Sequence, residues 1–341
     1  MNRRCPKCIH PSSGQKLYNP ADISQDVSVS SIQQKEDKLE ISWNDNHHST
    51  FPLSWLRDHC YSKKNLIAKT DPKLKTWKNG LKIPTLPFEE VMNTPEGLRE
   101  WLDELYTVGL VKITGCSVAP GTVERLARRI SHPRETMYGT IFDVVSIPDA
   151  MNIAYTSTAL DPHMDLLYYE APPGLQFLHC LVSEAKGGLS TFMDAFQCAD
   201  IMRTESPDLF NVITRVPTTY HKQGKDHSLS LQKTIVEVND NGHIVGVNYS
   251  PQFGGVISVP EEEVLDYYRA VSAFTEITRR KEMELSFHLK PGEIITFNNR
   301  RVLHGRTSFD ANSGGRHLQG IYVDLDEFYS KYRTFHRRET K

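Results

Sequence analysis

A series of short apolar segments with glycine and proline between them dominates the second half of the chain and most constrains its fold. The segments with strand character are 175–181, 189–193, 234–238, 244–249, 294–297 and 318–323. Many short strands separated by turns are typical of a barrel or jelly roll. One helical segment, 261–280, interrupts the series, and regular alternation of strands with helices is absent. The pattern predicts an α+β chain that is mainly β.

The first 84 residues have a different texture from the rest. Residues 38–43 and 48–53 alternate or nearly alternate, and the turn-rich stretch 44–47 between them predicts a β-hairpin followed by a short helix. Beyond residue 84, Thr94 and Pro95 form a helix start, 109–113 is strand-like, and 122–130 has helical periodicity. We therefore expect a small β-rich N-terminal domain, 1–84, and a larger domain, 85–341.

Charge and hydropathy exclude several classes of protein. The 40 Lys and Arg residues nearly balance 42 Asp and Glu, so the chain lacks the basic footprint of a nucleic-acid-binding protein. No segment approaches the ~18 consecutive apolar residues of a membrane span, and the basic start lacks the apolar core of a secretory signal. With only 6 cysteines, a reducing compartment is expected. The cytoplasm is the default, and an organelle stays open.

Two separated motifs carry the chemistry. His163-Met164-Asp165 places two metal-ligand side chains on one side of an extended segment, because residues i and i+2 of a strand share a face. His304, from a neighbouring strand, completes two histidines and one carboxylate, the facial arrangement of non-haem Fe(II) oxygenases. Arg316 follows at the start of an apolar strand, where a guanidinium suits the carboxylate of a cosubstrate. The alternative is a buried structural histidine and a surface arginine. Neither GxGxxG nor a phosphate loop occurs, which disfavours a nucleotide enzyme.

Several blocks of the sequence match a known family. They are RETMYG at 134–139, NIAYT at 152–156, HMD at 163–165, PPGLQ at 172–176, LHC at 178–180, NRRVLHGR at 299–306 and RHL at 316–318. With these blocks the chain resembles, from about Cys5 to Leu325, the γ-butyrobetaine and trimethyllysine dioxygenases within the taurine-dioxygenase-like oxygenases. The resemblance implies a double-stranded β-helix (jelly-roll) core with a small N-terminal β domain. It also implies a homodimer.

The resemblance assigns roles to individual residues. His163, Asp165 and His304 would bind Fe(II), and Arg316 would bind the far carboxylate of the cosubstrate 2-oxoglutarate. Ser190 would lie near that cosubstrate, on a weaker match. The implied reaction consumes O2, converts 2-oxoglutarate to succinate and CO2, and oxidises a C–H bond, with ascorbate as reductant. The protein supplies the ligand geometry and a dry pocket.

The family also implies a structural zinc ion in the N-terminal domain, held by three cysteines and one histidine. Cys5, Cys8 and His47 match three of these ligands, whereas the first cysteine falls at Arg3. Because structural zinc is almost always four-coordinate, the site is one ligand short. Substitution by His10 and two free cysteines with no zinc are the alternatives. The chain begins where relatives have upstream sequence, so we expect a shortened start.

The substrate pocket departs from the family pattern. The matched positions are Tyr138, Phe142, Asn152, Tyr155, Leu166 and Tyr322. Family members hold trimethylammonium groups in an aromatic cage, because ring faces stabilise a quaternary cation. Phe142 replaces a tryptophan and Leu166 a tyrosine, which leaves a cage of three tyrosines. The alternative for Phe142 is a place in the hydrophobic core.

These features predict an Fe(II)/2-oxoglutarate-dependent dioxygenase that acts on a small amino acid or betaine. Trimethyllysine and γ-butyrobetaine are the substrates that the overall resemblance implies. The eroded cage favours an alternative, which is hydroxylation, desaturation or ring closure of an ordinary amino acid in natural-product biosynthesis. A second alternative is a non-catalytic relative that binds a small acid. The intact set of His163, Asp165, His304 and Arg316 argues against it.

Overall fold

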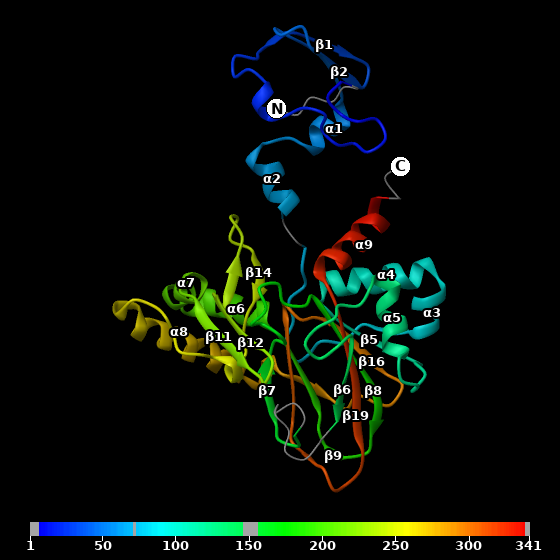
Figure 1. Cartoon of the computed structure of the whole chain (residues 1–341), viewed down its shortest axis with the longest axis vertical. Helices are drawn as coiled ribbons and strands as arrows, with labels where there is room; N and C mark the ends of the chain where they lie inside the picture. Colours follow the sequence, from blue (N-terminus) through cyan, green and yellow to red (C-terminus); the bar gives the residue numbers. More distant parts are fainter. Residues whose placement is uncertain (1–6, 71–72, 146–155, 338–341) are drawn as a thin grey trace. The chain divides into compact units, whose positions relative to one another are not determined.

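The computed structural model describes residues 7–70, 73–145 and 156–337, and the chain divides into two compact units, Met1–Pro72 and Lys73–Lys341 (Figure 1). Residues 73–84 belong to the second unit. Within it, Trp77 is buried, and its indole Nε1 donates a hydrogen bond of 2.9 Å to the carbonyl oxygen of Val108. Among the described residues, no helix combines the length and apolar character required to cross a membrane.

The first unit contains a three-stranded antiparallel sheet. Its strands are β1 (Val29–Lys35), β2 (Lys38–Trp43) and β3 (His48–Pro52), in that order. β2 and β3 pair from Lys38 opposite Pro52 to Ser42 opposite His48, which confirms the predicted hairpin. Asn46 in the turn has φ +60°, a left-handed conformation that asparagine tolerates. The predicted short helix is α1 (Leu53–Asp58), and η1 (Pro20–Asp22) and α2 (Lys63–Thr70) complete the unit.

Two larger sheets form the second unit. The six-stranded sheet has the order β4-β5-β16-β8-β19-β6, and the four-stranded sheet has the order β15-β10-β17-β7. Their strands are β4 (Thr85–Pro87), β5 (Leu110–Thr114), β6 (Ile141–Val145), β7 (Leu160–His163), β8 (Leu175–Ser183), β10 (Ser190–Asp194), β15 (Leu285–Phe287), β16 (Ile294–Asn298), β17 (Val302–Arg306) and β19 (Arg316–Val323). Strands distant in sequence are neighbours in both sheets, so the site described below is assembled from segments more than 100 residues apart.

Smaller hairpins and helices surround these sheets. The remaining pairs are β9 (Lys186–Gly187) with β18 (Phe309–Asp310), β11 (Thr218–Gln223) with β12 (Ser228–Lys233), and β13 (Val236–Val238) with β14 (Ile244–Val247). The helices are α3 (Phe88–Asn93), α4 (Pro95–Thr107), α5 (Thr122–Ile130), α6 (Ala195–Glu205), α7 (Pro207–Arg215), α8 (Glu261–Thr278) and α9 (Leu325–Arg337), with short 3-10 turns η3 (Pro251–Phe253) and η4 (Lys281–Met283). In Figure 1, α6, α7 and α8 lie on one side of the sheets and α3, α4 and α5 on the other.

The expectation of a single helix among the strands is wrong, because α6 and α7 also interrupt them. Asp194 caps α6 by accepting a hydrogen bond of 3.1 Å from the Phe196 N–H, and Pro207 begins α7. Both helices bury an apolar face, whose members include Met202 in α6 and Ile213 in α7. The predicted helix 261–280 is confirmed as α8, and 122–130 as α5.

One glycine allows a ring to pack against the six-stranded sheet near its β6 edge. On β19, Gly320 lies opposite Phe142 of β6, and a Cβ at that position would overlap the Phe142 ring. The ring instead stacks on Tyr322, with centroids 5.0 Å apart and planes at 22°. This packing directs Phe142 towards the space between the two sheets.

A buried ion pair connects the start of the second unit to the four-stranded sheet. Arg301 and Asp194, exposed by 1% and 0%, form it with an Nη2–Oδ2 distance of 2.8 Å. Asp194 also accepts a hydrogen bond of 3.1 Å from the Trp77 N–H. Arg301 donates to the carbonyl oxygens of Thr107 and Lys75 at 2.8 and 2.6 Å. One carboxylate therefore holds three separate segments of the chain.

Replacing Asp194 with asparagine should lower the free energy of unfolding by about 3–5 kcal/mol, because it leaves the buried Arg301 guanidinium without a counter-charge. Urea titration followed by circular dichroism measures the change. Asp266→Asn is the control, since Asp266 pairs with Arg269 in an exposed pair with side chains 57% and 68% accessible. That change should cost less than about 1 kcal/mol. Equal costs for the two variants would contradict this account of the Arg301–Asp194 pair.

Candidate active site

Two histidines face each other across neighbouring strands. His163 ends β7 and pairs directly with His304 of β17, so their side chains lie on one face of the four-stranded sheet. Their ring centroids are 4.3 Å apart. Gly305 makes this approach of the strands possible, because a Cβ there would overlap the carbonyl oxygen of Leu160. The register of β7 and β17 therefore brings together two predicted ligands that are 141 positions apart in the sequence.

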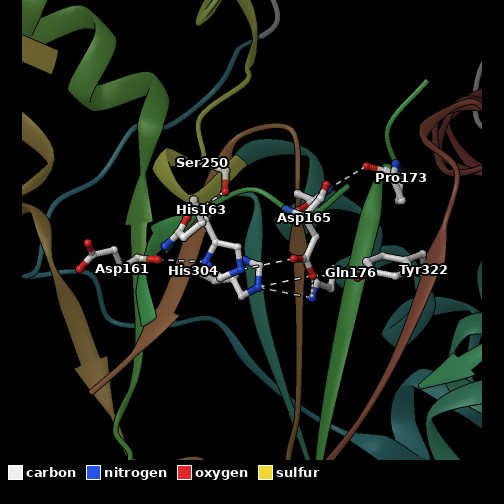
Figure 2. Close-up of polar contacts among 10 residues, drawn as sticks. Asp161, His163, Asp165, Pro173, Gln176, Ser250, His304 and Tyr322 are labelled. Carbon is white, nitrogen blue, oxygen red and sulfur yellow. Dashed lines mark hydrogen bonds and ion pairs between the residues drawn. The ribbon is translucent and has the colours of Figure 1, made fainter. Parts of the chain in front are cut away.

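Asp165 lies in the turn that follows β7. Asn299 holds this turn, since its Oδ1 accepts from the Asp165 N–H at 2.9 Å and its Nδ2 donates to the Asp165 carbonyl oxygen at 3.0 Å. The same Nδ2 donates to the carbonyl oxygen of Pro173 at 3.1 Å. The next residue, Leu166, has φ +58°, and this left-handed turn directs the chain away after Asp165. This buried asparagine thus fixes the position of Asp165. Figure 2 shows Asp165 beside His163 and His304.

The three side chains fit a divalent metal ion. Their potential ligand atoms all lie within 4.8 Å of one another. Within residues 7–70, 73–145 and 156–337, these three residues are the group of His, Cys, Asp or Glu side chains placed closely enough to hold a metal ion. His163 Nδ1 donates to the carbonyl oxygen of Asp161 at 3.0 Å, so in the neutral ring Nε2 carries the lone pair. That Nε2 lies 3.3 Å from Asp165 Oδ1, an arrangement of two electron-rich atoms that a cation between them would stabilise.

The protonation states suit a metal as well. The nearby histidines and the hydrogen bonds to the carboxylate outweigh burial and hold the pKa of Asp165 well below its usual range. Burial, and then the neighbouring His163, lower the pKa of His304 to about 3. A carboxylate and neutral imidazoles are the forms that bind a metal. Two histidines and one carboxylate with other positions open are the ligand set of non-haem iron oxygenases.

A pocket opens from these three residues between the two sheets. Its lining includes Ser190 of β10 and Arg316 of β19, the residues predicted for the cosubstrate. Burial lowers the pKa of the Arg316 guanidinium, which nevertheless remains charged. In the described part of the chain no carboxylate lies within ion-pair distance of Arg316, and its guanidinium lies over the Phe309 ring at 5.4 Å from the centroid. A charged guanidinium in a pocket, with no counter-ion among the described residues, suits a ligand carboxylate.

A second guanidinium in the pocket is already engaged. Arg306, two residues after His304, is buried and donates to the carbonyl oxygens of Thr156 and Thr158 at 2.6 and 3.3 Å through Nη2. Burial, with Arg316 nearby, lowers the pKa of Arg306 to about 10. Arg306 was not predicted from the sequence. Its contacts to carbonyl oxygens give it a structural role at the edge of the pocket, in contrast to Arg316.

Aromatic rings form part of the wall of the same pocket. Of the residues predicted for the substrate, Tyr138, Phe142, Leu166 and Tyr322 line the pocket, whereas Asn152 and Tyr155 lie outside the described residues. Tyr168 and Phe253 also line it, with ring centroids 5.0 Å apart in an edge-to-face arrangement.

The sequence analysis missed Tyr168, Gln176, Phe253 and Asn299. Gln176 and Asn299 stand inside the matching blocks, which was the available signal. Gln176 lies in β8, whose first seven residues are all buried, so alternation could not show which side chains face the pocket.

The proposed zinc ligands are partly described. The structure brings Cys8 and His47 together, with Cys8 Sγ 3.5 Å from His47 Nε2, and Cys8 is buried. Cys5 lies outside the described residues. His10 is exposed, and its Nδ1 accepts a hydrogen bond from the Ser13 N–H at 3.3 Å.

Comparison with known proteins decides the family. Residues 71–322 match the family described as taurine catabolism dioxygenase TauD, TfdA family, and residues 30–93 match the γ-butyrobetaine hydroxylase-like N-terminal family. The chain belongs to the TauD, TfdA dioxygenase family. The resemblance inferred from the sequence is therefore confirmed, and this member is an Fe(II)/2-oxoglutarate-dependent dioxygenase.

Relatives in this family match nearly the whole chain. It is 34% identical to γ-butyrobetaine dioxygenase of Pseudomonas sp. (strain AK-1), over 97% of this chain and 87% of the relative. It is 32% identical to γ-butyrobetaine dioxygenase of Homo sapiens, over 99% and 89%. Mitochondrial trimethyllysine dioxygenase of Rattus norvegicus is 30% identical, over 95% and 78%. A taurine dioxygenase of Burkholderia xenovorans superimposes with a TM-score of 0.54 at 14% identity, over 74% of this chain and 91% of that one, which supports the predicted jelly-roll core.

Proposed function

We propose that this dioxygenase oxidises a C–H bond of a small betaine or amino acid that carries a quaternary ammonium group, of the trimethyllysine or γ-butyrobetaine type. The observation that carries the proposal is the aromatic wall in the same pocket as the metal-binding residues. Tyr138, Phe142, Tyr168, Phe253 and Tyr322 all line that pocket. Ring faces stabilise a quaternary cation, which cannot donate a hydrogen bond and so needs no polar partner.

Each part of the pocket has a separate task. His163, Asp165 and His304 would hold Fe(II), and Arg316 would hold the far carboxylate of 2-oxoglutarate. When bound, iron supplies the oxidising chemistry, which consumes O2 and 2-oxoglutarate, releases succinate and CO2, and oxidises the substrate. The aromatic wall binds the cationic end of the substrate and keeps water away from it, because the rings offer few polar groups to hydrate. Ser190, the buried first residue of β10, would lie beside the cosubstrate in this proposal.

The pocket also explains why the eroded cage does not decide the substrate class. Leu166 occupies a predicted cage position and lines the pocket, as expected from sequence. Tyr168 and Phe253, which sequence analysis did not assign, add two rings to the same space. We therefore favour a trimethylammonium substrate over an ordinary amino acid in natural-product biosynthesis.

Succinate formation tests the proposal. Protein purified without O2 is given Fe(II), ascorbate, O2 and 2-oxoglutarate, together with trimethyllysine, γ-butyrobetaine, lysine or other unmodified amino acids. Stimulation by a trimethylated compound is the expected result. Stimulation only by an unmodified amino acid would establish the alternative. Iron uptake without succinate from any compound would support the metal site and contradict the proposed oxidation.

A neutral analogue isolates the effect of charge. 5,5-Dimethylhexanoate has the shape of γ-butyrobetaine, with a carbon atom in place of the quaternary nitrogen. If the rings hold a cation, γ-butyrobetaine should bind more tightly by about 1–2 kcal/mol, or roughly 5- to 30-fold. Isothermal titration calorimetry measures both. Equal affinities would mean that the wall recognises shape alone.

Four finer assignments accompany the proposal; the compartment rests on the low cysteine content, and the other three rest on the family resemblance. Ascorbate would act as the reductant, the protein would be a homodimer, and the cytoplasm would be its compartment, with an organelle as the alternative. A structural zinc ion on Cys5, Cys8 and His47 has one further support, the 3.5 Å distance between Cys8 Sγ and His47 Nε2.

A further inference from the structure

Two hydrogen bonds converge on one oxygen of Asp165. Gln176 Nε2 donates to Oδ2 at 2.8 Å, and the Tyr322 hydroxyl donates to the same atom at 2.7 Å (Figure 2). The other oxygen, Oδ1, lies 3.3 Å from His163 Nε2, whereas Oδ2 lies 3.7 Å from His304 Nε2. The two oxygens of this carboxylate therefore have different surroundings.

The donors are built into the opposite sheet. Gln176 on β8 and Tyr322 on β19 are direct partners in the register of the six-stranded sheet, so both side chains project from one face towards the pocket. Their target follows β7, and the two histidines belong to the four-stranded sheet. The hydrogen bonds to Oδ2 thus connect the two sheets at the candidate metal site.

The chemistry of the groups determines the direction of both bonds. An amide NH2 group can only donate, so Asp165 Oδ2 accepts from Gln176 Nε2, and the Tyr322 hydroxyl is the second donor to the same oxygen. Gln176 must present its NH2 group to Oδ2. The other end of the amide, Oε1, is buried and has no hydrogen-bond partner among the described residues. The hydrogen bonding of the Gln176 amide to those residues is therefore made by its NH2 group, which also lies 3.5 Å from His304 Nε2. A glutamine that only stabilised the fold would be expected to satisfy both ends of its amide.

We infer that Gln176, together with Tyr322, is a positioning residue that holds Asp165 Oδ2 away from the metal and leaves Oδ1 as the ligand atom. Two donors on Oδ2 occupy its lone pairs, and they stop the carboxylate from rotating. Rotation would place both oxygens at the metal and use a coordination position that the reaction needs. The inference rests on the proposed iron site. It assigns a role to Gln176, for which the sequence analysis expected none, and a second role to Tyr322, which was expected only in the aromatic cage.

The first test replaces Gln176 with methionine, which has a similar length and no amide. Binding of Mn²⁺ alone, measured from the electron paramagnetic resonance of the free ion, should weaken by about 10- to 100-fold, the usual effect of losing a group behind a metal ligand. The visible absorption of the Co²⁺-loaded protein should change as well, because a rotated carboxylate alters the coordination number. A merely structural role would leave that spectrum unchanged.

Tyr322→Phe gives a second, milder variant. It removes one oxygen and keeps the ring that stacks on Phe142 at 5.0 Å. We expect weaker Mn²⁺ binding and a changed Co²⁺ spectrum. The double variant should lose less Mn²⁺ binding free energy than the sum of the losses in the two single variants, because both residues act on the same oxygen.

Gln319→Met is the matched control. Gln319 is also a buried glutamine, on β19, and it bonds to Asp143 and to the Gly121 N–H, away from Asp165. It should bind Mn²⁺ with the affinity of the unmodified protein. Unchanged Mn²⁺ affinity and Co²⁺ spectrum in folded Gln176→Met would overturn the inference; if that variant does not fold, the same result in Tyr322→Phe would do so.

The outcomes separate this inference from the proposed function. If the unmodified protein binds no Mn²⁺ and forms no succinate, the proposed function fails. If it binds Mn²⁺ and turns over 2-oxoglutarate while the variants match it, only the positioning role fails.

Discussion

Replacing His304 with alanine is expected to abolish the conversion of 2-oxoglutarate to succinate and to prevent stable binding of Fe(II) or Mn²⁺. The change removes one of three protein ligands, which lie within 4.8 Å of one another. Loss of a ligand should exceed the roughly 10- to 100-fold effect of losing a group behind a ligand. Succinate assays and equilibrium metal binding measure the two consequences separately.

The fold should survive this change. The His304 ring contacts the rings of His163 and Phe297 in tilted arrangements, and its buried Nδ1 has no hydrogen-bond partner in the part of the chain described here. Circular dichroism of the variant should therefore match that of the unmodified protein. His221→Ala is the control, because His221 is exposed on β11 and does not line the pocket. Full activity of His304→Ala would remove the histidine from the metal site.

Replacing Arg316 with methionine should raise the KM for 2-oxoglutarate by about 100-fold while metal binding stays unchanged. The substitution keeps an apolar stem near the Phe309 ring and removes the guanidinium. A hydrogen bond to a charged group contributes about 1.5–3 kcal/mol, and an arginine makes two to a carboxylate in its bidentate form. Steady-state succinate formation at varied 2-oxoglutarate measures the effect.

Lysine at the same position refines the test. Arg316→Lys keeps the positive charge and loses the planar pair of donors, so its KM should fall between those of the methionine variant and the unmodified enzyme. The Mn²⁺ affinity of both variants without 2-oxoglutarate should equal that of the unmodified protein. An unchanged KM in Arg316→Met would show that another group binds the cosubstrate.

Much of the site could be predicted because its residue types have few other uses in such a pattern. His163 and His304 lie on neighbouring strands as expected, whereas Asp165 lies in the turn after β7 and not on the strand that the HxD spacing predicted. Arg316 begins an apolar strand, as predicted. The family blocks around them specified these positions independently of any geometry. The residues that the sequence did not reveal are those whose types are common in cores. Gln176 and Asn299 are polar residues within or beside buried strands, and only their hydrogen bonds to Asp165 distinguish them.

Tyr322 shows how a correct location can come with an incomplete role. Its position predicted a cage residue, and it does line the pocket. Its hydroxyl, however, donates to Asp165 Oδ2 at 2.7 Å, so the residue also belongs to the support of the metal ligand. A matching motif specifies where a residue stands in the family's fold. It does not specify which polar group that residue contacts.

The sequence by itself determined the family, the class of chemistry and the residues that carry it, because these depend on residue identity and order along the chain. The tertiary structure alone decided which strands are neighbours, and so which side chains share the pocket. Pairing of β8 with β19 places Gln176 beside Tyr322, and pairing of β7 with β17 places His163 beside His304. Such pairings join segments more than 100 residues apart. They follow from the packing of two whole sheets, which no local pattern in the sequence encodes.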